Sequence, residues 1–411
     1  MRITVICIGD ELLIGQVTDT NSGFLARTIA PEGWEVERTE VVADDAEAIT
    51  DAIERALSRT DVVITTGGLG PTADDITKPT LCKIFGGGLR HDPAVEANVR
   101  EVMSRRGREM NELTRLQSMV PESATIIQNR VGTAPILMFE RDGKTLVAMP
   151  GVPFETQEMF VAEVFPRLLS RYSSGISVAH STMIVAGISE SMLAEHLAEF
   201  ENSLPESLHL AYLPKPGIIR LRLDGHSTDA NALNAFMADY VERLREATAQ
   251  WRIADDDLPT AAILIERLRE RGLTMATAES CTGGNIAHEI TLIAGASDVM
   301  AGGVVAYSNS VKSGLLGVDP DLIAAYGAVS IPVAEAMASG ACLATGADIA
   351  IATSGIAGPG GGTPDKPVGT VCVAVASPSG LISTTLHLHG TRQRIIERAT
   401  SEALLMAISA L

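Results

Sequence analysis

Two short segments in the last third of the chain place a serine and a lysine where apolar runs end. Residues 273–284 are typical of a buried strand that reaches Ser280 and stops at two glycines, before an apolar helix predicted over residues 285–293. A serine at such a turn is expected to expose its hydroxyl beside the unpaired N–H groups of a helix N-terminus, where an oxyanion or a phosphate can bind. The same pattern is also typical of a serine that only caps a helix.

The second segment, residues 304–312, is an apolar run that ends in a cluster containing Tyr307, Ser308, Asn309 and Lys312. A lysine can act as the base for a serine when desolvation depresses its pKa, and a tyrosine can donate or relay a proton. The chain has no Gly-x-Ser-x-Gly elbow, so a Ser-His-Asp hydrolase of that kind is disfavoured. These residues favour nucleophilic catalysis by serine with a lysine base.

A third segment, residues 351–362, is typical of a strand that runs into a glycine-rich loop. Such a loop brings its backbone close to an anion, although its composition suits a flexible surface loop equally well.

Five motifs occur in order over residues 258–411: T-A-E-S-C-T-G-G, A-Y-S-N-x-x-K, G-A-V-S, S-G-I-A-G-P-G-G-G and K-P-V-G-T-V. This part of the chain resembles the C-terminal domain of the CinA family, an α/β domain related to nicotinamide mononucleotide deamidase. The resemblance implies hydrolysis of nicotinamide mononucleotide to nicotinate mononucleotide and ammonia, without a cofactor. It implies Ser280 as nucleophile, Lys312 as base and Tyr307 as an assisting group. The implied substrate contacts are Thr282, Gly283, Gly284, Asn309, Ser354, Gly355, Gly358 and Arg392, the last as a phosphate ligand.

The elements at the other end of the chain alternate between strands and helices. Apolar runs predict strands over residues 3–8, 34–42, 62–65 and 146–149, and helical patterns fall over residues 21–29, 46–57, 78–85 and 154–169. Such alternation predicts an α/β fold with a parallel sheet covered by helices on both faces. Ligands of these sheets bind outside the carboxyl ends of the strands.

Acidic residues and glycines follow three of these strands, in the loops after residues 8, 65 and 149, and Asp44 follows the strand predicted over residues 34–42. The residues concerned are Asp10, Glu11, Asp44, Gly67, Gly68, Asp74, Asp75, Pro150 and Gly151. Glycine turns allow backbone N–H groups to approach a phosphate, and carboxylates supply the hard oxygens that a divalent cation prefers. A single aspartate after a strand is usually a turn or helix cap. Three loops at one sheet edge nevertheless predict metal-assisted attack on a phosphoanhydride.

The same loops carry the motifs I-G-D-E-L-L-I-G-Q-V-x-D-T-N, T-T-G-G-L-G-P-T-x-D-D-I-T and P-G-V-P-x-E. They resemble the N-terminal CinA domain, whose three-layer αβα fold is similar to molybdopterin-binding domains. The resemblance implies hydrolysis of ADP-ribose to AMP and ribose 5-phosphate with a divalent metal (Mg, Mn or Co). It implies metal ligands among Asp10, Glu11, Asp44, Asp74 and Asp75, and substrate contacts at Asn21, Gly67, Gly68, Pro150 and Gly151. The chain departs from the family pattern at Ala73, Thr114 and Leu116, where histidine, asparagine and lysine are common, so the C-terminal activity has the stronger support.

Two shorter matches are set aside. Gly143-Lys144-Thr145 resembles the end of a P-loop, but the required first glycine position is Met138, and Lys144 is better placed in a hairpin turn. His288-Glu289 lacks the second histidine of a zincin helix, so zinc is unsupported.

The middle of the chain has no catalytic spacing of its own. Strands are predicted over residues 182–185 and 217–223 and helices over residues 189–200 and 230–247, and the run Asp255-Asp256-Asp257 is typical of a linker. The pattern resembles the small α+β connector of the CinA family, distantly like a KH domain. No G-x-x-G loop can be placed in it, so we expect a spacer or a dimer contact and no RNA binding.

Composition limits the class of protein. With 411 residues, 46% of them hydrophobic and 20% charged, the chain is expected to form two to three globular domains. Its net charge of −19 argues against broad binding to nucleic acid. Five scattered cysteines, an N-terminal strand in place of a signal peptide and a strand-turn-strand pattern over the uncharged residues 368–391 predict a cytoplasmic protein without a membrane span.

Together these patterns predict a molybdopterin-binding-like domain over residues 1–168, a connector over residues 169–257 and a deamidase domain over residues 258–411. The hypothesis is a bifunctional hydrolase of pyridine-nucleotide salvage that binds small-molecule nucleotides and forms a homodimer. Two alternatives stay open: an N-terminal domain that handles molybdopterin, and a non-catalytic partner in competence or DNA damage.

Overall fold

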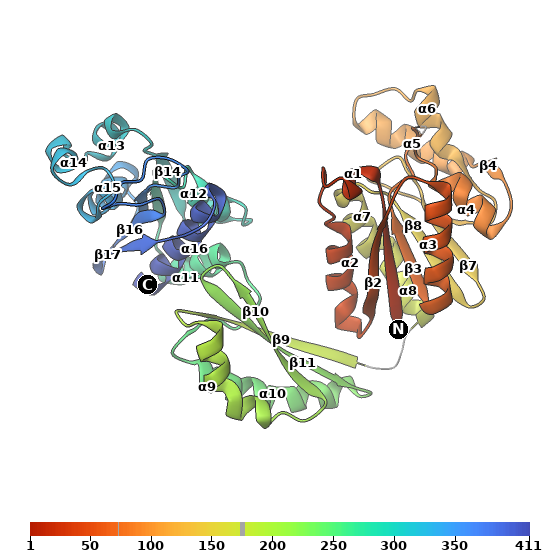
Figure 1. Ribbon diagram of the computed structural model, residues 1–411, viewed down its shortest axis with the longest axis horizontal. Helices are drawn as coiled ribbons and strands as arrows, with labels where there is room; N and C mark the ends of the chain where they lie inside the picture. The colour runs from red at the N-terminus through yellow and green to blue at the C-terminus, as the bar shows by residue number, and fades with distance from the viewer. Residues whose placement is uncertain (73, 173–176) are drawn as a thin grey trace. The chain divides into compact units, whose positions relative to one another are not determined.

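The computed structural model (Figure 1) describes residues 1–72, 74–172 and 177–411. It divides into two compact units, one of Met1–Ala179 with Gly225–Phe236 and one of His180–Asp224 with Met237–Leu411. Ala73, one of the departures from the family pattern, lies outside the described residues.

The first unit is built on a six-stranded sheet in the order β2-β1-β3-β8-β7-β6. Four strands are parallel, as predicted: β1 (Arg2–Ile8), β2 (Glu35–Val42), β3 (Val62–Thr66) and β8 (Lys144–Met149). Strand β7 (Ile136–Arg141) runs antiparallel to β8, and β6 (Thr125–Ile127) runs antiparallel to β7, so β7 alone among these six strands runs against the predicted parallel direction. The cause is the tight turn at Asp142 and Gly143, both with positive φ, because a two-residue turn can join only antiparallel strands.

Helices cover both faces of this sheet, which gives the three-layer αβα arrangement. Alternate residues of a strand point to opposite faces. Accordingly Ile6 packs with α3 (Ala46–Arg59), α4 (Thr77–Phe85) and α5 (Pro93–Arg105), whereas Val5 packs with the helices of the other face. Those are α2 (Asn21–Ile29) and the continuous helical segment predicted over residues 154–169. This segment consists of α7 (Pro153–Met159), a π-helical turn η3 (Phe160–Val164) and α8 (Phe165–Tyr172) (Figure 1).

Helix α5 was not predicted, although the chain carries signals for it. Val95, Val99 and Val102 recur at helical spacing and are buried, and Asp92 caps the helix by accepting hydrogen bonds from the next turn. The shorter elements of this unit are α1 (Asp10–Leu13), η1 (Ala30–Glu32), β4 (Leu89–His91), α6 (Glu112–Arg115), η2 (Leu116–Ser118) and β5 (Met119–Pro121).

The middle of the chain forms a four-stranded sheet in the order β10-β11-β9-β12 with two helices, an α+β arrangement as predicted. Its elements are β9 (Ser177–Ala186), α9 (Glu190–Asn202), β10 (Leu208–Lys215), β11 (Ile218–Ser227), α10 (Ala230–Thr248) and β12 (Arg252–Ala254). Strand β10 was missed, because the pattern around it is interrupted by prolines.

The C-terminal part is a five-stranded sheet in the order β14-β13-β15-β16-β17. Its strands are β13 (Met275–Glu279), β14 (Met300–Val305), β15 (Ile349–Gly355), β16 (Thr370–Ser377) and β17 (Gly380–His387), the first three parallel and the last two antiparallel. The β16–β17 hairpin is the strand-turn-strand predicted for the uncharged stretch. Among the described residues, no helix is both long and apolar enough to cross a membrane.

Helices also cover both faces of this sheet. One face packs against α11 (Thr260–Arg271), α12 (Asn285–Thr291) and α16 (Arg392–Ala410), and the other against α13 (Asn309–Leu316) and α15 (Ile331–Thr345), with α14 (Pro320–Tyr326) beside α15. Parallel β13, β14 and β15 end at one edge, so the residues that follow them meet there.

Candidate active sites

The serine and the lysine predicted as a catalytic pair are in contact in the C-terminal part. Ser280 follows β13, and Lys312 lies on α13, whose N-terminus is capped by Ser308. Lys312 Nζ donates hydrogen bonds to Ser280 Oγ at 3.1 Å and to the Ala306 carbonyl oxygen at 2.7 Å. Both side chains are buried, with 8% of Ser280 and 2% of Lys312 exposed, so the expectation of an exposed serine hydroxyl is wrong.

Burial sets the proton affinities of this pair. Desolvation of the Lys312 ammonium lowers the pKa of that side chain, an effect that neighbouring Cys281 partly opposes. Burial raises the pKa of the Cys281 thiol to about 12, so Cys281 stays protonated at neutral pH and is a poor nucleophile. Ser280, beside a lysine whose pKa is lowered by burial, is therefore the better candidate for the nucleophile.

The helix N-terminus beside Ser280 is already occupied by a carboxylate of the protein. Glu279, fully buried, accepts hydrogen bonds from the backbone N–H groups of Gly284 (3.0 Å), Ile286 (3.0 Å) and Ala287 (2.9 Å). These three groups are not available to a substrate phosphate or oxyanion, contrary to the prediction. Glu279 instead fixes the turn that holds Ser280, a role that the sequence analysis missed although the residue stands in the T-A-E-S-C-T-G-G motif.

A cavity of about 260 Å³ opens in front of the pair. It brings together these predicted residues: Ser280, Tyr307, Asn309, Lys312, Ser354, Gly355 and Arg392. Arg392, the first residue of α16, donates from Nη2 to Tyr307 Oη at 3.1 Å and from Nη1 to the Gly358 carbonyl oxygen at 2.7 Å. The guanidinium therefore lies at the edge of the cavity, where it can meet an anion.

One wall of this cavity is held by two side chains. Lys366 Nζ donates to the carbonyl oxygens of Tyr326 (2.8 Å) and Val329 (2.7 Å), and Ser354 Oγ donates to that of Ala328 (2.6 Å). Ala328 and Val329 line the cavity, so Lys366 supports the site without touching it. The motifs that contain these residues were recognised, but their contact was not predicted.

Four predicted substrate contacts do not line this cavity. The Thr282 hydroxyl is buried against that of Thr353 at 2.7 Å, and Gly283 and Gly284 form the turn before α12. The Gly358 carbonyl oxygen accepts a hydrogen bond from Arg392, which does line the cavity.

A second cavity, of about 470 Å³, lies where β1, β3 and β8 of the N-terminal sheet end. The three predicted loops converge there. The predicted residues that line it are Glu11, Asn21, Asp44, Gly67, Gly68, Asp74, Asp75, Pro150 and Gly151. Asp10 does not line it but is linked to Asp44 by two hydrogen bonds between backbone N–H and carboxylate, of 3.1 and 3.3 Å.

Glycine is required in the middle of these loops. Gly67 has φ of 111°, and a Cβ there would lie 2.1 Å from the Ile8 carbonyl oxygen. A Cβ at Gly68 would lie 2.0 Å from Thr77 Oγ1, and one at Gly151 would lie 3.3 Å from Gly67 Cα. Gly67 and Gly151 therefore pack against neighbouring backbone and Gly68 against the Thr77 side chain, which leaves main-chain groups at the cavity wall.

The predicted metal ligands form an acidic group rather than a preformed metal centre. Burial raises the pKa of Asp44, and the carboxylates of Asp10, Glu11 and Asp74 raise it further. Across residues 1–72, 74–172 and 177–411, no three His, Cys, Asp or Glu side chains are grouped so as to hold a metal ion. The oxygen donors suit a hard divalent cation that takes its remaining ligands from water and phosphate, as Mg²⁺ commonly does.

Asp75 has a structural role in its loop. Its carboxylate accepts hydrogen bonds from Gly70 N (2.7 Å), Thr72 N (2.9 Å) and the Thr72 hydroxyl.

Two departures from the family pattern lie outside the cavity lining. Thr114 donates from its backbone and hydroxyl groups to the Asn111 carboxamide oxygen, and Leu116 is half exposed. The neighbouring residue Gln117 does line the cavity and was not predicted to bind ligand.

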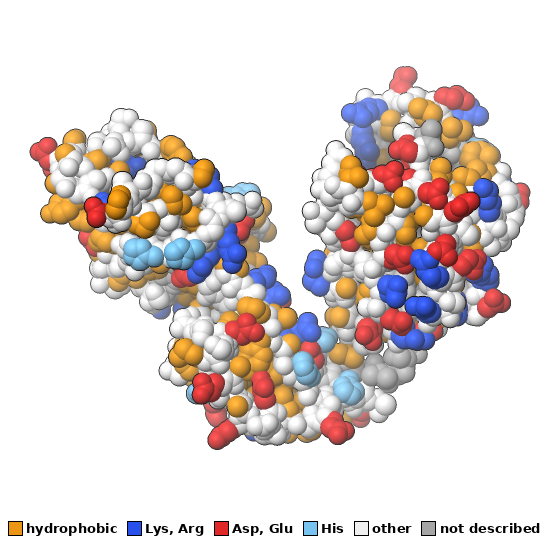
Figure 2. All heavy atoms as spheres, in the orientation of Figure 1, with side chains coloured by type: hydrophobic (Ala, Val, Ile, Leu, Met, Phe, Trp, Pro, Cys, Tyr) orange, Lys and Arg blue, Asp and Glu red, His pale blue; other side chains and the backbone are white. Residues whose placement is uncertain are grey.

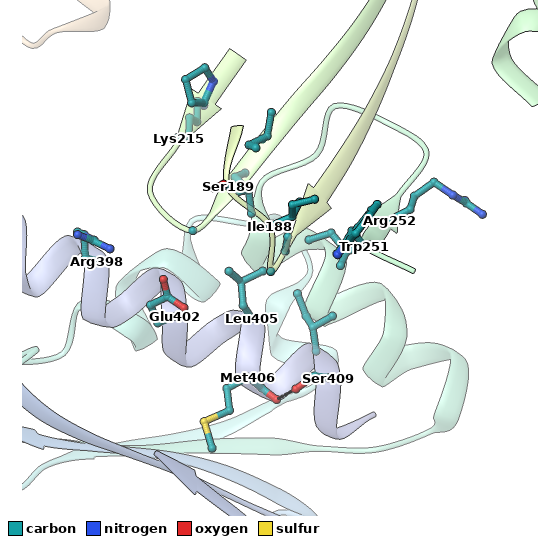
Figure 3. Close-up of a pocket in the computed structure, with 18 of the residues that line it drawn as sticks. Ile188, Ser189, Lys215, Trp251, Arg252, Arg398, Glu402, Leu405, Met406 and Ser409 are labelled. Atoms are coloured by element: carbon teal, nitrogen blue, oxygen red, sulfur yellow. Dashed lines mark hydrogen bonds between the residues drawn. The ribbon is translucent and has the colours of Figure 1, made fainter. Parts of the chain in front are cut away.

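A larger cavity, of about 930 Å³, shares no lining residue with either site (Figure 3). Figure 3 shows Arg398, Glu402, Leu405, Met406 and Ser409 along α16, opposite residues of the α+β region. No serine–lysine pair of the kind found at Ser280 is among its lining residues, so it is not a candidate for the same chemistry.

Comparisons with known proteins match the chain throughout. Family models match residues 257–411 (CinA C-terminal domain), 4–170 (probable molybdopterin binding domain) and 180–251 (damage-inducible protein CinA KH domain). A CinA-like protein of Gemmatimonas aurantiaca is 42% identical, covering 98% of this chain and 95% of its own. A putative competence-damage inducible protein of Symbiobacterium thermophilum is 41% identical, covering 99% and 98%.

Among solved structures, the competence/damage inducible protein CihA of Agrobacterium tumefaciens is 40% identical with a TM-score of 0.36. The match covers 36% of this chain and 92% of that one. With relatives above 40% identity over nearly the full length, the chain belongs to the CinA family.

Proposed function

We propose that the C-terminal site hydrolyses the carboxamide of nicotinamide mononucleotide to give nicotinate mononucleotide and ammonia. The observation that carries this proposal is the 3.1 Å contact between two buried side chains, Lys312 Nζ and Ser280 Oγ. A lysine whose pKa is lowered by burial can take the proton of a serine hydroxyl, which makes the oxygen nucleophilic.

The reaction follows from the positions of these groups. Ser280 Oγ attacks the carboxamide carbon while its proton passes to neutral Lys312. The tetrahedral intermediate then collapses, the C–N bond breaks, and Lys312 returns the proton to the leaving nitrogen, which departs as ammonia. Lys312 next takes a proton from water, which attacks the acyl-serine ester; Lys312 returns that proton to Ser280 Oγ as the ester bond breaks, and nicotinate mononucleotide is released.

The cavity suits the rest of this substrate. Arg392 supplies a cation for the 5′-phosphate, and Tyr307, hydrogen-bonded to Arg392, brings its hydroxyl to the same cavity as the reacting pair. No step of this reaction uses a metal.

The test is ammonia release from nicotinamide mononucleotide, measured with and without EDTA for the intact protein and for Ser280→Ala. We expect chelator-insensitive turnover that falls by about 10³-fold or more in the variant, because the nucleophile is lost. A correctly folded wild-type protein without turnover would refute the deamidase. Turnover that survives Ser280→Ala would refute the nucleophile and keep the reaction.

We further propose that the N-terminal cavity hydrolyses ADP-ribose to AMP and ribose 5-phosphate. In support, glycine loops from three strands place backbone close to the cavity, and carboxylates from two of these loops line it. Glu11, Asp44 and Asp74 are the residues that would hold a divalent cation (Mg, Mn or Co), which would offset the charge of a pyrophosphate.

The protein's own groups bind and orient this substrate. Gly67 and Gly68 allow the pyrophosphate to approach the main chain, and Asn21, fixed through Nδ2 to the Gly151 carbonyl oxygen at 2.9 Å, presents its carboxamide oxygen. AMP formation measured with and without EDTA tests the proposal. We expect EDTA to abolish it while deamidation in the same sample continues.

A molybdopterin-binding role is the second candidate for this cavity, favoured by the family model that matches residues 4–170. Pterin bound to the purified protein, detected by fluorescence after acid oxidation, would support it over hydrolysis.

A non-catalytic partner in DNA damage or competence has less support. The net charge is −19, and Figure 2 shows basic and acidic side chains interspersed on the visible face of the N-terminal unit. DNA binding that weakens steeply with salt would support this role. The proposal also includes a cytoplasmic location and a homodimer. Light scattering on the intact protein would test whether it forms a dimer.

A further inference from the structure

Two buried carboxamide groups in the wall of the N-terminal cavity each have one atom without a hydrogen-bond partner among the described residues. These atoms are Gln117 Nε2 and Asn21 Oδ1. Only 1% of Gln117 and 6% of Asn21 is exposed. A buried polar atom without a partner costs about 1–3 kcal/mol, so a native protein rarely keeps one unless a ligand or water completes it.

The hydrogen bonds of Gln117 determine which of its atoms is left over. Lys78 Nζ donates to Gln117 Oε1 at 2.6 Å and to its backbone carbonyl oxygen at 3.3 Å. Because an ammonium group has no acceptor, the oxygen of the carboxamide must face Lys78 and the NH₂ group must face away. Gln117 therefore offers a donor, and its partner must be an acceptor.

The orientation of Asn21 is fixed in the same way, with the opposite result. Asn21 Nδ2 donates to the Gly151 carbonyl oxygen, which leaves Oδ1 as a free acceptor. Asn21 begins α2 on one face of the sheet, whereas Lys78 lies on α4 on the other face. The cavity therefore presents a hydrogen-bond donor, Gln117 Nε2, beside the buried Lys78 ammonium. It presents a hydrogen-bond acceptor, Asn21 Oδ1, from the other face of the sheet.

We propose that Gln117 is a substrate-binding residue of the N-terminal site whose Nε2 donates a hydrogen bond to a phosphoryl oxygen of a pyrophosphate ligand. This inference rests on the proposed ADP-ribose hydrolysis. A phosphoryl oxygen is favoured over a neutral acceptor because the Lys78 ammonium places positive charge directly behind Gln117. Lys78 is the positioning residue, since it acts on the ligand only through Gln117. Asn21 Oδ1 is left to meet a hydroxyl group or a cation at the other wall.

The substitution Gln117→Glu separates this role from a structural one. Glutamate has nearly the same shape and keeps an oxygen acceptor for Lys78, but it replaces the donor with a negative oxygen. A structural role predicts an unchanged or more stable protein with unchanged substrate use. A phosphoryl contact predicts that the KM for ADP-ribose and the Kd for inorganic pyrophosphate both rise about tenfold to hundredfold, with little change in Tm.

The experiment measures ADP-ribose hydrolysis and, by calorimetry, pyrophosphate binding, each with added Mg²⁺, on the full chain. Gln157→Glu on α7 is the matched control, because it adds the same charge to the same unit outside the cavity lining. Lys78→Met is the second variant, and we expect a smaller loss of affinity because Gln117 keeps its donor but loses its support.

Each outcome decides a different point. Wild-type values of KM and Kd in Gln117→Glu overturn the role of Gln117, as they would if a permanent buried water met Nε2. Pyrophosphate binding that is lost in Gln117→Glu, in a protein that does not hydrolyse ADP-ribose, keeps the contact and refutes the proposed reaction. A wild-type protein that neither binds pyrophosphate nor turns over ADP-ribose overturns both.

Discussion

The two candidate sites differ in how completely the protein satisfies its own polar groups. At the C-terminal site, Lys312 contacts Ser280 and a carbonyl oxygen, and Glu279 is bound by three backbone N–H groups. At the N-terminal site, buried atoms of Asn21 and Gln117 have no hydrogen-bond partner within the described part of the chain, and burial together with neighbouring carboxylates raises the pKa of Asp44.

This difference suggests a different way of working for each of the two proposed activities. A reacting pair that is already assembled needs only a substrate held in front of it, because the protein has met the cost of orienting its own groups. A cavity with unmatched donors, acceptors and charges is completed by its ligand and counter-ion. The comparison therefore predicts that substitution of the serine–lysine pair or of its support reduces kcat at the first site, and that substitution of the unmatched groups weakens binding at the second.

The largest effect is expected from Lys312→Met, which keeps the length and burial of the side chain but removes the base. Loss of a general base lowers kcat by about 10²- to 10⁴-fold. Ammonia release measures this loss, and ADP-ribose hydrolysis by the same variant should be unchanged. Lys215→Met, a lysine of the β10–β11 hairpin that is distant from Ser280 in the sequence and absent from that cavity, is the control. A KM effect without a kcat effect would contradict the role of base.

A smaller effect is expected from Glu279→Gln, which keeps the shape of the group that holds the serine turn. The neutral amide accepts fewer and weaker hydrogen bonds, so the turn should shift and kcat for deamidation should fall about tenfold to hundredfold. Urea unfolding should also show a loss of about 1.5–3 kcal/mol. Glu270→Gln on the exposed surface of α11 is the control. An unchanged kcat would show that Ser280 does not depend on this carboxylate.

The residues that the sequence predicted and those that it missed differ in kind. Ser280, Lys312 and the loops around Gly67 and Gly151 follow apolar runs, and parallel strands bring such positions to one edge. Their convergence can therefore be read from the pattern along the chain.

The contacts of Glu279 and Gln117 depend on tertiary packing that no local pattern encodes. Glu279 stands at the end of a strand, where a carboxylate ordinarily faces solvent. It contacts the N-terminus of α12 because the chain turns back at Gly284 and brings those N–H groups to the carboxylate. Strand β6 was missed for a different reason, since it is only three residues long and has no periodicity to detect.

A still smaller effect is expected from Arg392→Lys. Lysine keeps the charge but cannot contact Tyr307 and a phosphate at once in the planar geometry of a guanidinium. The KM for nicotinamide mononucleotide should rise about tenfold, with kcat nearly unchanged. Arg394→Lys, two residues further along α16 and absent from the cavity lining, is the matched control. Equal effects in the two variants would contradict a phosphate contact at Arg392.

The finest test of the comparison uses pH, because each site buries one lysine and uses it differently. Burial lowers the pKa of Lys78 to about 8 and also lowers that of Lys312. Deamidation needs neutral Lys312, so its rate should rise with pH and level off below the pKa of an ordinary lysine, about 10.4. Pyrophosphate binding needs protonated Lys78 to hold Gln117, so its Kd should rise above about pH 8.

The two lowered lysine pKa values change the free energy of unfolding in the same direction. A lysine that binds its proton more weakly in the folded chain makes the free energy of unfolding rise with pH, between about 8 and 10.5 for Lys78. Stability therefore cannot explain a loss of pyrophosphate affinity in that range, and the two variants test whether the Lys78–Gln117 contact is its cause. Gln117→Glu and Lys78→Met should both remove the alkaline loss of affinity. A Kd that stays constant from pH 7 to about pH 10 in the wild type would refute the positioning role of Lys78.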